Sequence, residues 1–315
     1  MLVLVGYFAV AMAALVALGA VVRFGVGAAF AGPVGALFRS MPLTAAFGLT
    51  VITIYIVGAV FAPLIAPYGE SQVFESYNAL PGDIPEHILG TDQIGRDLLS
   101  RLIYGGRNTI GIALVTTFLA FFLGASLGFL AAVLGGWFDQ VLSRTVDALM
   151  AIPQLIFALL LITILGQSTI NMILVIAVLD STRVFRLSRA VGLNIVVMDY
   201  IEAAKLRGES LSYLIFREIL PNATAPLLAE FGLRFCFVFL LIASLSFLGI
   251  GIQPPLADWG TMVRELGQFI NYAVAPGFEL AASLPLMPAA AIALLTVAVN
   301  FVVDWMLHRY SGLKE

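Results

Sequence analysis

The chain has 315 residues, of which 61% are hydrophobic and only 11% are charged. Its mean hydropathy is +1.03. Soluble domains carry about 25% charged residues, so this composition excludes a soluble globular protein and indicates an integral membrane protein. The formal net charge of −3 says little, because here the distribution of charges matters more than their sum. The single cysteine, Cys236, excludes a disulfide within the chain and a cysteine-based zinc cluster.

The first apolar run, Leu2–Val22, carries no charge, and about 20 such residues cross a bilayer. It lacks the positive start and small-residue cleavage site of a signal peptide, so we predict a retained span, with an interfacial helix as the alternative. A Gly-rich connector, Arg23–Pro42, leads to a second span at Leu43–Ile65. Pro63 and Pro67 close that span.

The segment Tyr68–Arg107 is polar and acidic. Gly90 and Gly95 predict a turn with unusual backbone angles. Leu98–Arg107 has apolar residues on one helical face, so we predict a short amphipathic helix that lies along the membrane surface. The two histidines, His87 and His308, offer no metal-ligand spacing and are predicted to lie at the surface.

Five further apolar runs predict spans at Asn108–Leu134, Thr145–Leu165, Thr169–Phe185, Phe231–Ile252 and Leu286–Leu307. In the first of these, Gly124 and Gly128 form a G-x-x-x-G pattern, which permits close contact with a neighbouring helix.

Two acids lie within or beside these spans, where a carboxylate is costly and needs a partner. Asp147 is predicted to pair with Arg144 at i,i+3 spacing. Asp180 is predicted to lie near the membrane interface, with Arg183 and Arg186 as partners. The alternative for Asp180 is a pore-facing carboxylate that meets an amine.

The longest polar passage of the C-terminal half runs from Asp199 to Leu228. Tyr200–Leu206 predicts a helix, and Gly208 predicts its end. An amphipathic helix follows, and Pro221 is predicted to stop it. Its apolar residues recur at helical spacing: Leu211, Leu214, Ile215 and Ile219. This order of elements favours a docking surface over a solvated helical hairpin.

The basic residues predict the orientation, because cytoplasmic loops carry an excess of Lys and Arg. If the segment Asp199–Leu228 is cytoplasmic, the outer side holds only Arg96, Arg101, Arg107 and Arg264. The inner side then holds Arg23, Arg39, Arg144, Arg183, Arg186, Arg189, Lys205, Arg207, Arg217, Arg234, Arg309 and Lys314. This topology has seven spans, an external N-terminus and a cytoplasmic C-terminus.

Within the polar segment, one set of residues resembles the EAA loop of the membrane subunits of binding-protein-dependent ABC importers: Glu202, Ala203, Ala204, Gly208, Leu220 and Pro221. The resemblance implies a coupling helix that sits in a groove of a cytoplasmic ATPase. In this role Glu202 pairs with a basic or amide group, the two alanines allow close approach, and Gly208 lets the chain turn.

Two further motifs are similar to those of the dipeptide, oligopeptide and nickel branch of this family. One lies in the external loop and comprises Gly90, Thr91, Asp92, Gly95, Arg96 and Asp97. The other runs from Leu248 to Pro255 and is followed by Asp258, Trp259 and Gly260. The alternative for the external motif is a structured loop in which Asp92 and Arg96 pair locally.

The resemblance implies an all-α membrane protein with the type I ABC importer permease fold, about six core transmembrane helices and one extra N-terminal helix. The expected organisation is residues 1–42 as the extra helix and connector, 43–107 as the first core helix and external loop, and 108–315 as the core permease with a coupling loop at 199–228. The expected localisation is the bacterial inner membrane.

The implied function is that of a permease subunit in an ATP-driven importer of di- or oligopeptides, forming half of the pathway. The only lysines, Lys205 and Lys314, do not follow the glycines that a P-loop needs, so ATP is expected to be hydrolysed by another chain. No Ser/His/Asp grouping, metal cluster or paired carboxylate stands out, so no catalytic site and no bound cofactor are expected on this chain. ATP and Mg²⁺ are expected on two cytoplasmic ATPase subunits. A second permease and a periplasmic or lipid-anchored solute-binding protein complete the set of partners. The alternatives are a permease for nickel or another small solute, and an ion-coupled secondary transporter.

Overall fold

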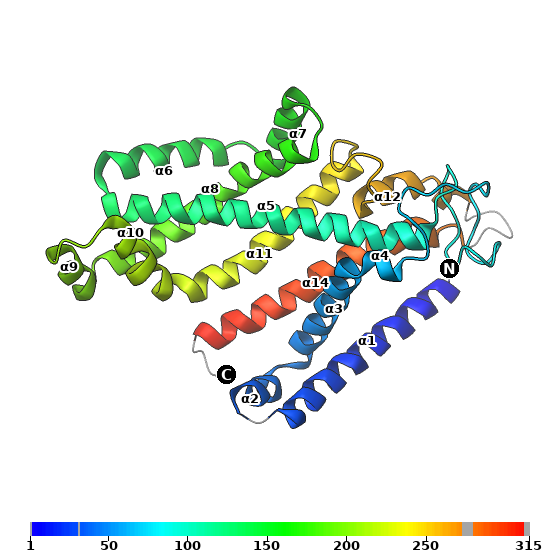
Figure 1. Cartoon of the computed structure of the whole chain (residues 1–315), viewed down its shortest axis with the longest axis horizontal. Helices are drawn as coiled ribbons and strands as arrows, with labels where there is room; N and C mark the ends of the chain where they lie inside the picture. Colours follow the sequence, from blue (N-terminus) through cyan, green and yellow to red (C-terminus); the bar gives the residue numbers. More distant parts are fainter. Residues whose placement is uncertain (1, 31, 273–279, 312–315) are drawn as a thin grey trace. The chain divides into compact units, whose positions relative to one another are not determined.

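The computed structural model describes residues 2–30, 32–272 and 280–311, which form helices, turns and one long irregular loop (Figure 1). These described residues contain isolated bridges, Val73 with Arg96 and Thr91 with Asp97, and no regular strand. The chain divides into two compact units, the first made of residues 1–111 and 239–315 and the second of residues 112–238. Lys314 lies outside the described residues.

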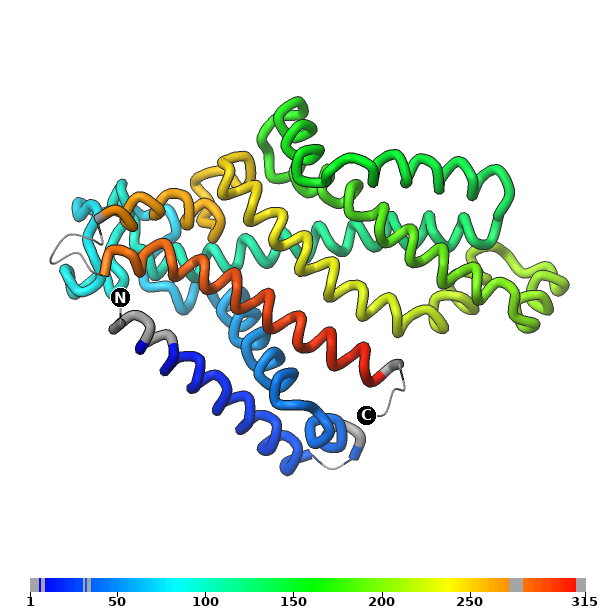
Figure 2. Tube along the Cα trace, turned by 180° about the vertical axis from the view of Figure 1, so that it is seen from behind, coloured from blue at the N-terminus to red at the C-terminus, as the bar shows by residue number. Residues whose placement is uncertain are grey.

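The first unit packs its long helices side by side. It contains α1 (Leu2–Ala29), α2 (Pro33–Ser40), α3 (Leu43–Val60), α4 (Ala62–Ile65), α12 (Trp259–Leu266), α13 (Phe269–Tyr272) and α14 (Ser283–Ser311). Helix α3 contacts both α1 and α14, as Figure 2 shows from behind. Gly19 and Gly48 permit these contacts, because a Cβ atom at Gly48 would lie 2.4 Å from the carbonyl oxygen of Ala298.

The second unit contains α6 (Gly136–Met150), α7 (Gln154–Leu165), α8 (Thr169–Val196), α9 (Asp199–Leu206), α10 (Leu211–Tyr213) and the π-helix η1 (Leu214–Ile219). It also contains the second part of α5 (Leu98–Leu134) and the first part of α11 (Leu220–Phe247). Helices α6 and α7 meet at an angle of 92°.

Among the described residues, five helices are long and apolar enough to cross a membrane, and α6 with α7 would make a sixth if the bent pair is one span. Helix α8 is continuous over 28 residues, but charged side chains interrupt its apolar sequence: Asp180, Arg183, Arg186 and Arg189. The predicted seventh span, which depends on α8, stays a prediction. The N-terminal helix reaches Ala29, beyond the predicted end at Val22.

The predicted surface helix at Leu98–Arg107 was wrong, because this segment is the beginning of the continuous helix α5. Its polar face is buried, with Ser100 0% and Arg101 2% exposed, whereas a helix on a membrane surface would expose that face to water. Gly105 and Gly106 do not break α5. A Cβ atom at either glycine would lie within 3.0 Å of the Trp259 ring, at 2.9 and 2.8 Å respectively.

The predicted proline stop at Pro221 was also wrong, since the chain stays helical from Leu211 to Phe247. The π-helix η1 ends at Ile219, two residues before the proline, and the backbone N–H of Leu220 bonds to the carbonyl of Ile215, five residues earlier. A proline ring normally collides with the carbonyl four residues before it. The wider π turn relieves that collision, so the helix continues.

The predicted close contact at Gly124 and Gly128 is confirmed, and α8 is the partner helix. A Cβ atom at Gly124 would lie 2.5 Å from the carbonyl oxygen of Ser181. A Cβ atom at Gly128 would lie 2.8 Å from the carbonyl oxygen of Phe185 and from Cβ of Ser188. The backbones of α5 and α8 can therefore approach each other only with glycine at these positions.

We expect Gly124→Ala to destabilise the protein by about 1–3 kcal/mol, because the added methyl group overlaps backbone atoms of α8. Gly111→Ala, in the same helix, is the matched control, since nothing lies within 4 Å of a Cβ atom there. Thermal unfolding of the purified protein in detergent compares the two variants. Equal unfolding temperatures for both would contradict the assigned contact.

Candidate functional site

Helix α9 has one face in the core of the second unit and one face in solvent. Ile201 and Ala204 are 0% exposed, and they pack in a cluster that includes Phe129 of α5 and Ile195 of α8. Glu202, next to Ala203 in the chain, is exposed. The periodicity of the helix thus anchors α9 on one side and presents the glutamate outward on the other.

The turn after α9 forms at Gly208, as predicted from the sequence. Gly208 has φ +78°, a left-handed conformation that is strained for residues with a side chain. Ser210 then caps α10 by accepting a hydrogen bond from the backbone N–H of Tyr213 at 3.3 Å. The cluster that anchors α9 also buries the apolar side of η1: Leu214, Ile215 and Ile219. Leu211, predicted on the same face, is 43% exposed.

The coupling residues do not all share one surface. Glu202, Ala203, Gly208 and Pro221 are exposed, Ala204 is buried, and Leu220 is half-buried. Large apolar side chains of this region also face outward: Val197, Met198, Tyr200, Leu206, Leu211 and Phe216. Leu206 is 84% exposed and Phe216 is 64% exposed. Contiguous exposed apolar patches mark interaction surfaces, so these side chains are candidates for one.

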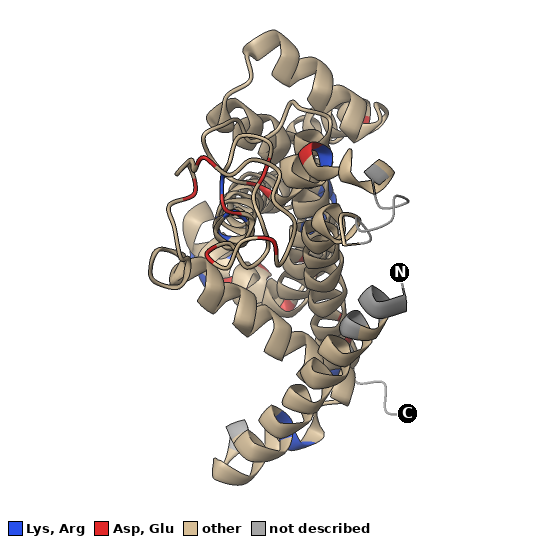
Figure 3. Cartoon of the chain, turned by 90° about the vertical axis from the view of Figure 1, so that its right-hand side faces the viewer, with Lys and Arg blue, Asp and Glu red and all other residues tan. Residues whose placement is uncertain are grey.

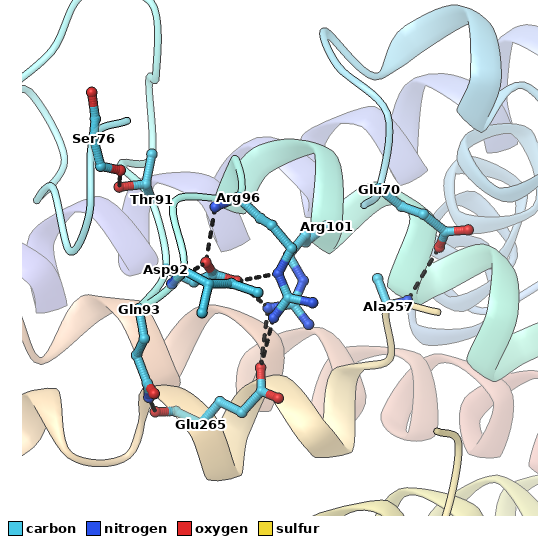
Figure 4. Close-up of polar contacts among 10 residues, drawn as sticks. Glu70, Ser76, Thr91, Asp92, Gln93, Arg96, Arg101, Ala257 and Glu265 are labelled. Carbon is cyan, nitrogen blue, oxygen red and sulfur yellow. Dashed lines mark hydrogen bonds and ion pairs between the residues drawn. The ribbon is translucent and has the colours of Figure 1, made fainter. Parts of the chain in front are cut away.

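The loop of the first unit that was predicted to be external, residues 68–97, is organised around the buried carboxylate of Asp92 (Figure 4). Its Oδ2 accepts hydrogen bonds from Nε of Arg96 at 2.7 Å and from Nη1 of Arg101 at 2.5 Å. Its Oδ1 accepts from the backbone N–H of Arg96 at 2.9 Å. Nη1 of Arg101 also donates to Oε2 of Glu265 in α12 at 3.1 Å, so a four-residue ion-pair cluster ties the loop to that helix.

The other motif residues of this loop also have structural contacts. Asp97 Oδ2 accepts from the backbone N–H and the hydroxyl of Ser100, each at 2.7 Å, and so caps the start of α5. The hydroxyl of Thr91 donates to the carbonyl of Ser76 at 2.7 Å. Gly90 and Gly95 have φ +80° and +84°, as predicted. These contacts support the interpretation that Asp92 and Arg96 pair locally.

The predicted surface position of His87 was wrong. His87 is 3% exposed, and its Nδ1 lies 2.9 Å from Oδ1 of Asp97. The rings of Tyr68 and Phe74 pack against the imidazole at centroid distances of 5.2 and 4.7 Å. The carboxylate of Asp97, ten residues further along the chain, is what makes the buried position favourable. His308 is exposed, as predicted.

Asp258 and Trp259 join the beginning of α12 to α5. Asp258 accepts hydrogen bonds from the backbone N–H groups of Gly260 at 3.2 Å and Thr261 at 2.7 Å. Burial raises the pKa of the Asp258 carboxyl, while its hydrogen bonds with Thr261 and Gly260 act in the opposite direction. The indole Nε1 of Trp259 donates to the carbonyl of Leu102 at 2.8 Å.

The buried acid of α8 has a different partner from the predicted ones. Asp180 is 0% exposed, and its Oδ1 lies 3.7 Å from Nη1 of Arg234 in α11. Nε of Arg234 lies 2.7 Å from Oε1 of Glu230, so the guanidinium stands between two carboxylates. The predicted position of Asp180 near the membrane interface stays a prediction. Two opposite charges in separate apolar runs, Asp180 and Arg234, were the overlooked signal.

Asp147 also has a different partner. Its Oδ1 lies 3.7 Å from Nη2 of Arg186, and both side chains are largely exposed. The predicted partner was Arg144. Arg189 donates from Nε and Nη2 to the two carboxylate oxygens of Asp139, which fastens α6 to α8. The local i,i+3 rule failed because the side chains of α8 compete for the acids of α6.

Residues 120–311 match the family model described as binding-protein-dependent transport system inner membrane component. Residues 44–81 match the N-terminal transmembrane domain of oligopeptide transport permease C. The chain belongs to this family of inner membrane transport components, and its helices have the all-α type I ABC importer permease fold.

Individual relatives agree with the family match. A dipeptide transport system permease protein DppC of Haemophilus influenzae is 36% identical over 82% of this chain and 87% of its own length. The corresponding protein of Alkalihalophilus pseudofirmus is 35% identical over 74% of this chain and 78% of its own length. A probable D,D-dipeptide transport system permease protein DdpC of Escherichia coli is 33% identical over 89% of this chain and 91% of its own length.

We expect Asp92→Asn to destabilise the protein by about 3–5 kcal/mol, because Arg96 and Arg101 lose a shared countercharge in a buried site. Asp147→Asn is the control, since its partner Arg186 has a 59% exposed side chain and such pairs contribute about 0–1 kcal/mol. Thermal unfolding in detergent measures both. A smaller loss for Asp92→Asn than for the control would contradict the cluster's structural role.

Proposed function

We propose that this chain is the membrane-spanning permease subunit of an ATP-driven importer of di- or oligopeptides, and that it forms half of the translocation pathway. The proposed substrate class rests on one observation. Over 74% to 89% of its length, the chain is similar to permeases named for dipeptides. A relative in Pectobacterium atrosepticum, 30% identical, is named for glutathione, a tripeptide. These names favour peptides over the nickel alternative.

Coupling to ATP hydrolysis is proposed to run through α9. Its exposed Glu202 and Ala203, with the exposed apolar side chain of Leu206 on the same helix, offer a small surface to a groove in a cytoplasmic ATPase. The buried Ala204 joins that surface to α5 and α8. Movement of the ATPase then moves α9 as a rigid body and switches the access of the spans.

The partners follow from this mechanism. Two cytoplasmic ATPase subunits supply ATP and Mg²⁺, and a second, similar permease completes the pathway. A periplasmic or lipid-anchored binding protein delivers the peptide to the outer side. The external loop of the first unit carries many acidic residues, shown in red in Figure 3, which suits that side under the positive-inside rule. The C-terminus is then cytoplasmic, and the protein itself lies in the bacterial inner membrane.

The ion-coupled alternative receives less support. Such transporters use intramembrane acids whose charge changes during transport. The buried acid of α8, Asp180, stands beside the guanidinium of Arg234, which offers it a fixed countercharge. Asp180 remains a candidate either for lining the pathway or for holding α8 against α11, and Asp147 pairs with Arg186 at an exposed position.

We expect Ala203→Leu and Ala204→Leu to fail in different ways. Ala203 is exposed, so a larger side chain there should leave the permease stable but weaken copurification of the ATPase at least roughly tenfold. Ala204 is 0% exposed, so the same change should lower the unfolding temperature of the permease itself through overpacking. Intact ATPase binding by a stable Ala203→Leu variant would contradict docking through α9.

Replacing Glu202 and Gly208 together, by Lys and Val, should reduce ATP-dependent uptake to background in complexes that still assemble. The lysine reverses the charge offered to the ATPase, and valine is strained at φ +78°. Uptake per assembled complex in proteoliposomes is the measurement. Transport that continues with an ion gradient and no ATPase would support the secondary transporter instead.

The substrate class is tested on the reconstituted complex with its cognate binding protein. Uptake of a labelled dipeptide should require ATP, should be competed by unlabelled di- and tripeptides, and should be unaffected by nickel or free amino acids. Competition by nickel and not by peptides would overturn the substrate class. Absence of all ATP-dependent uptake in the wild-type complex would overturn the importer itself.

A further inference from the structure

Three arginines from three helices gather at one end of the first unit. Arg23 of α1 donates from Nη2 to the carbonyl oxygen of Arg39, in α2, at 3.2 Å. Arg39 donates from Nη1 to the carbonyl oxygen of Gly27 at 2.6 Å. Nη1 of Arg309, in α14, lies 3.5 Å from the hydroxyl of Ser40. Figure 2 shows α2 between the end of α1 and the described end of α14. We call Arg23, Arg39 and Arg309 the arginine cluster.

The arginine cluster lacks a countercharge in the part of the chain that the structure describes. Its contacts go to neutral carbonyl and hydroxyl oxygens, and none of its members takes part in an ion pair between described residues. Nε of Arg23 is buried and has no hydrogen-bond partner there. Like charges held together repel one another, so an anion bound among them would be stabilised.

The side chain of arginine also suits a phosphate group. Each guanidinium presents five N–H donors in a planar fork, which matches phosphate oxygens bidentately. Aromatic rings support two of them: Cζ of Arg23 lies 5.2 Å from the ring centroid of Phe24, and Cζ of Arg309 lies 5.9 Å from that of Trp305. Each arginine uses only part of its donors on the protein, which leaves further donors for a ligand.

The surroundings favour a lipid phosphate over a free one. Only 6% of the apolar stretch Ala9–Ala29 of α1 is buried within the chain, although one side of α1 packs on α3. Val21, Phe24 and Phe30, close to Arg23 along the chain, are 65%, 63% and 55% exposed. An acyl chain lying along α1 would cover these side chains, whereas inorganic phosphate would leave them uncovered.

The location is also consistent with a lipid. The positive-inside rule places this end of the first unit at the cytoplasmic leaflet, where anionic lipids attract basic residues. Arg23 and Arg39 lie outside both matched family regions, 44–81 and 120–311. We propose that the arginine cluster binds the phosphate group of an anionic phospholipid, whose acyl chains run along the exposed face of α1.

The test uses the purified wild-type complex in detergent micelles doped with phosphatidylglycerol or with phosphatidylcholine. Native mass spectrometry counts the retained lipids. We expect the wild type to retain phosphatidylglycerol in preference, and Arg23→Gln with Arg39→Gln to reduce that preference roughly fivefold for each charge removed. Arg144→Gln with Arg217→Gln is the matched control, because it removes two exposed charges that are also predicted on the cytoplasmic side but lie outside the cluster.

Two further arms distinguish lipid binding from a purely structural role of the arginines and from binding of free phosphate. Arg23→Lys with Arg39→Lys keeps the charges, so it should retain most of the preference, whereas a purely structural role would make it fail like the glutamine variant. Inorganic phosphate at millimolar concentration should not displace phosphatidylglycerol. The proposal is overturned if the glutamine variant keeps the wild-type preference, if the lysine variant loses it fully, if the control loses it equally, or if free phosphate displaces the lipid.

Discussion

The burial of Ile201 and Ala204 against Phe129 and Ile195 is the contact on which the proposed coupling depends. A helix as short as α9, with eight residues, is not stable by itself in water. Packing on the ends of α5 and α8 supplies its stability and fixes its orientation. The same contact makes α9 part of a rigid body, so that a force on its exposed face reaches two long helices.

A second constraint is the cost of charge away from water. Asp92, Asp97 and Asp180 are almost fully buried, and each lies close to a basic group or a set of hydrogen-bond donors. Such clusters stabilise less than their number of contacts suggests, because removing ions from water is costly. We infer that their effect is specificity, because a change in the packing of α12 on this loop of the first unit would leave Arg101 without Glu265.

Local patterns predicted the elements of the candidate site well and the environments of its charges poorly. The helix at 199–206, the turn at Gly208 and the close contact at Gly124 depend on neighbours in the chain or on the lack of a side chain. The errors at His87 and Pro221 have another origin. Burial of the histidine depends on Asp97 and two aromatic rings, and the proline is admitted by a π turn that no spacing rule indicates.

The sequence alone determined that this is a helical membrane protein of the importer permease family, because hydropathy and motif spacing are properties of the chain. It also determined that the helix α9 ends at Leu206. Only the tertiary structure decided which charges meet. Asp92 shares Arg101 with Glu265, which is 164 residues from that arginine, and Asp180 faces Arg234 of another helix. Ion pairs form between groups that folding brings close in space, and the local spacing of residues carries no information about such distant partners.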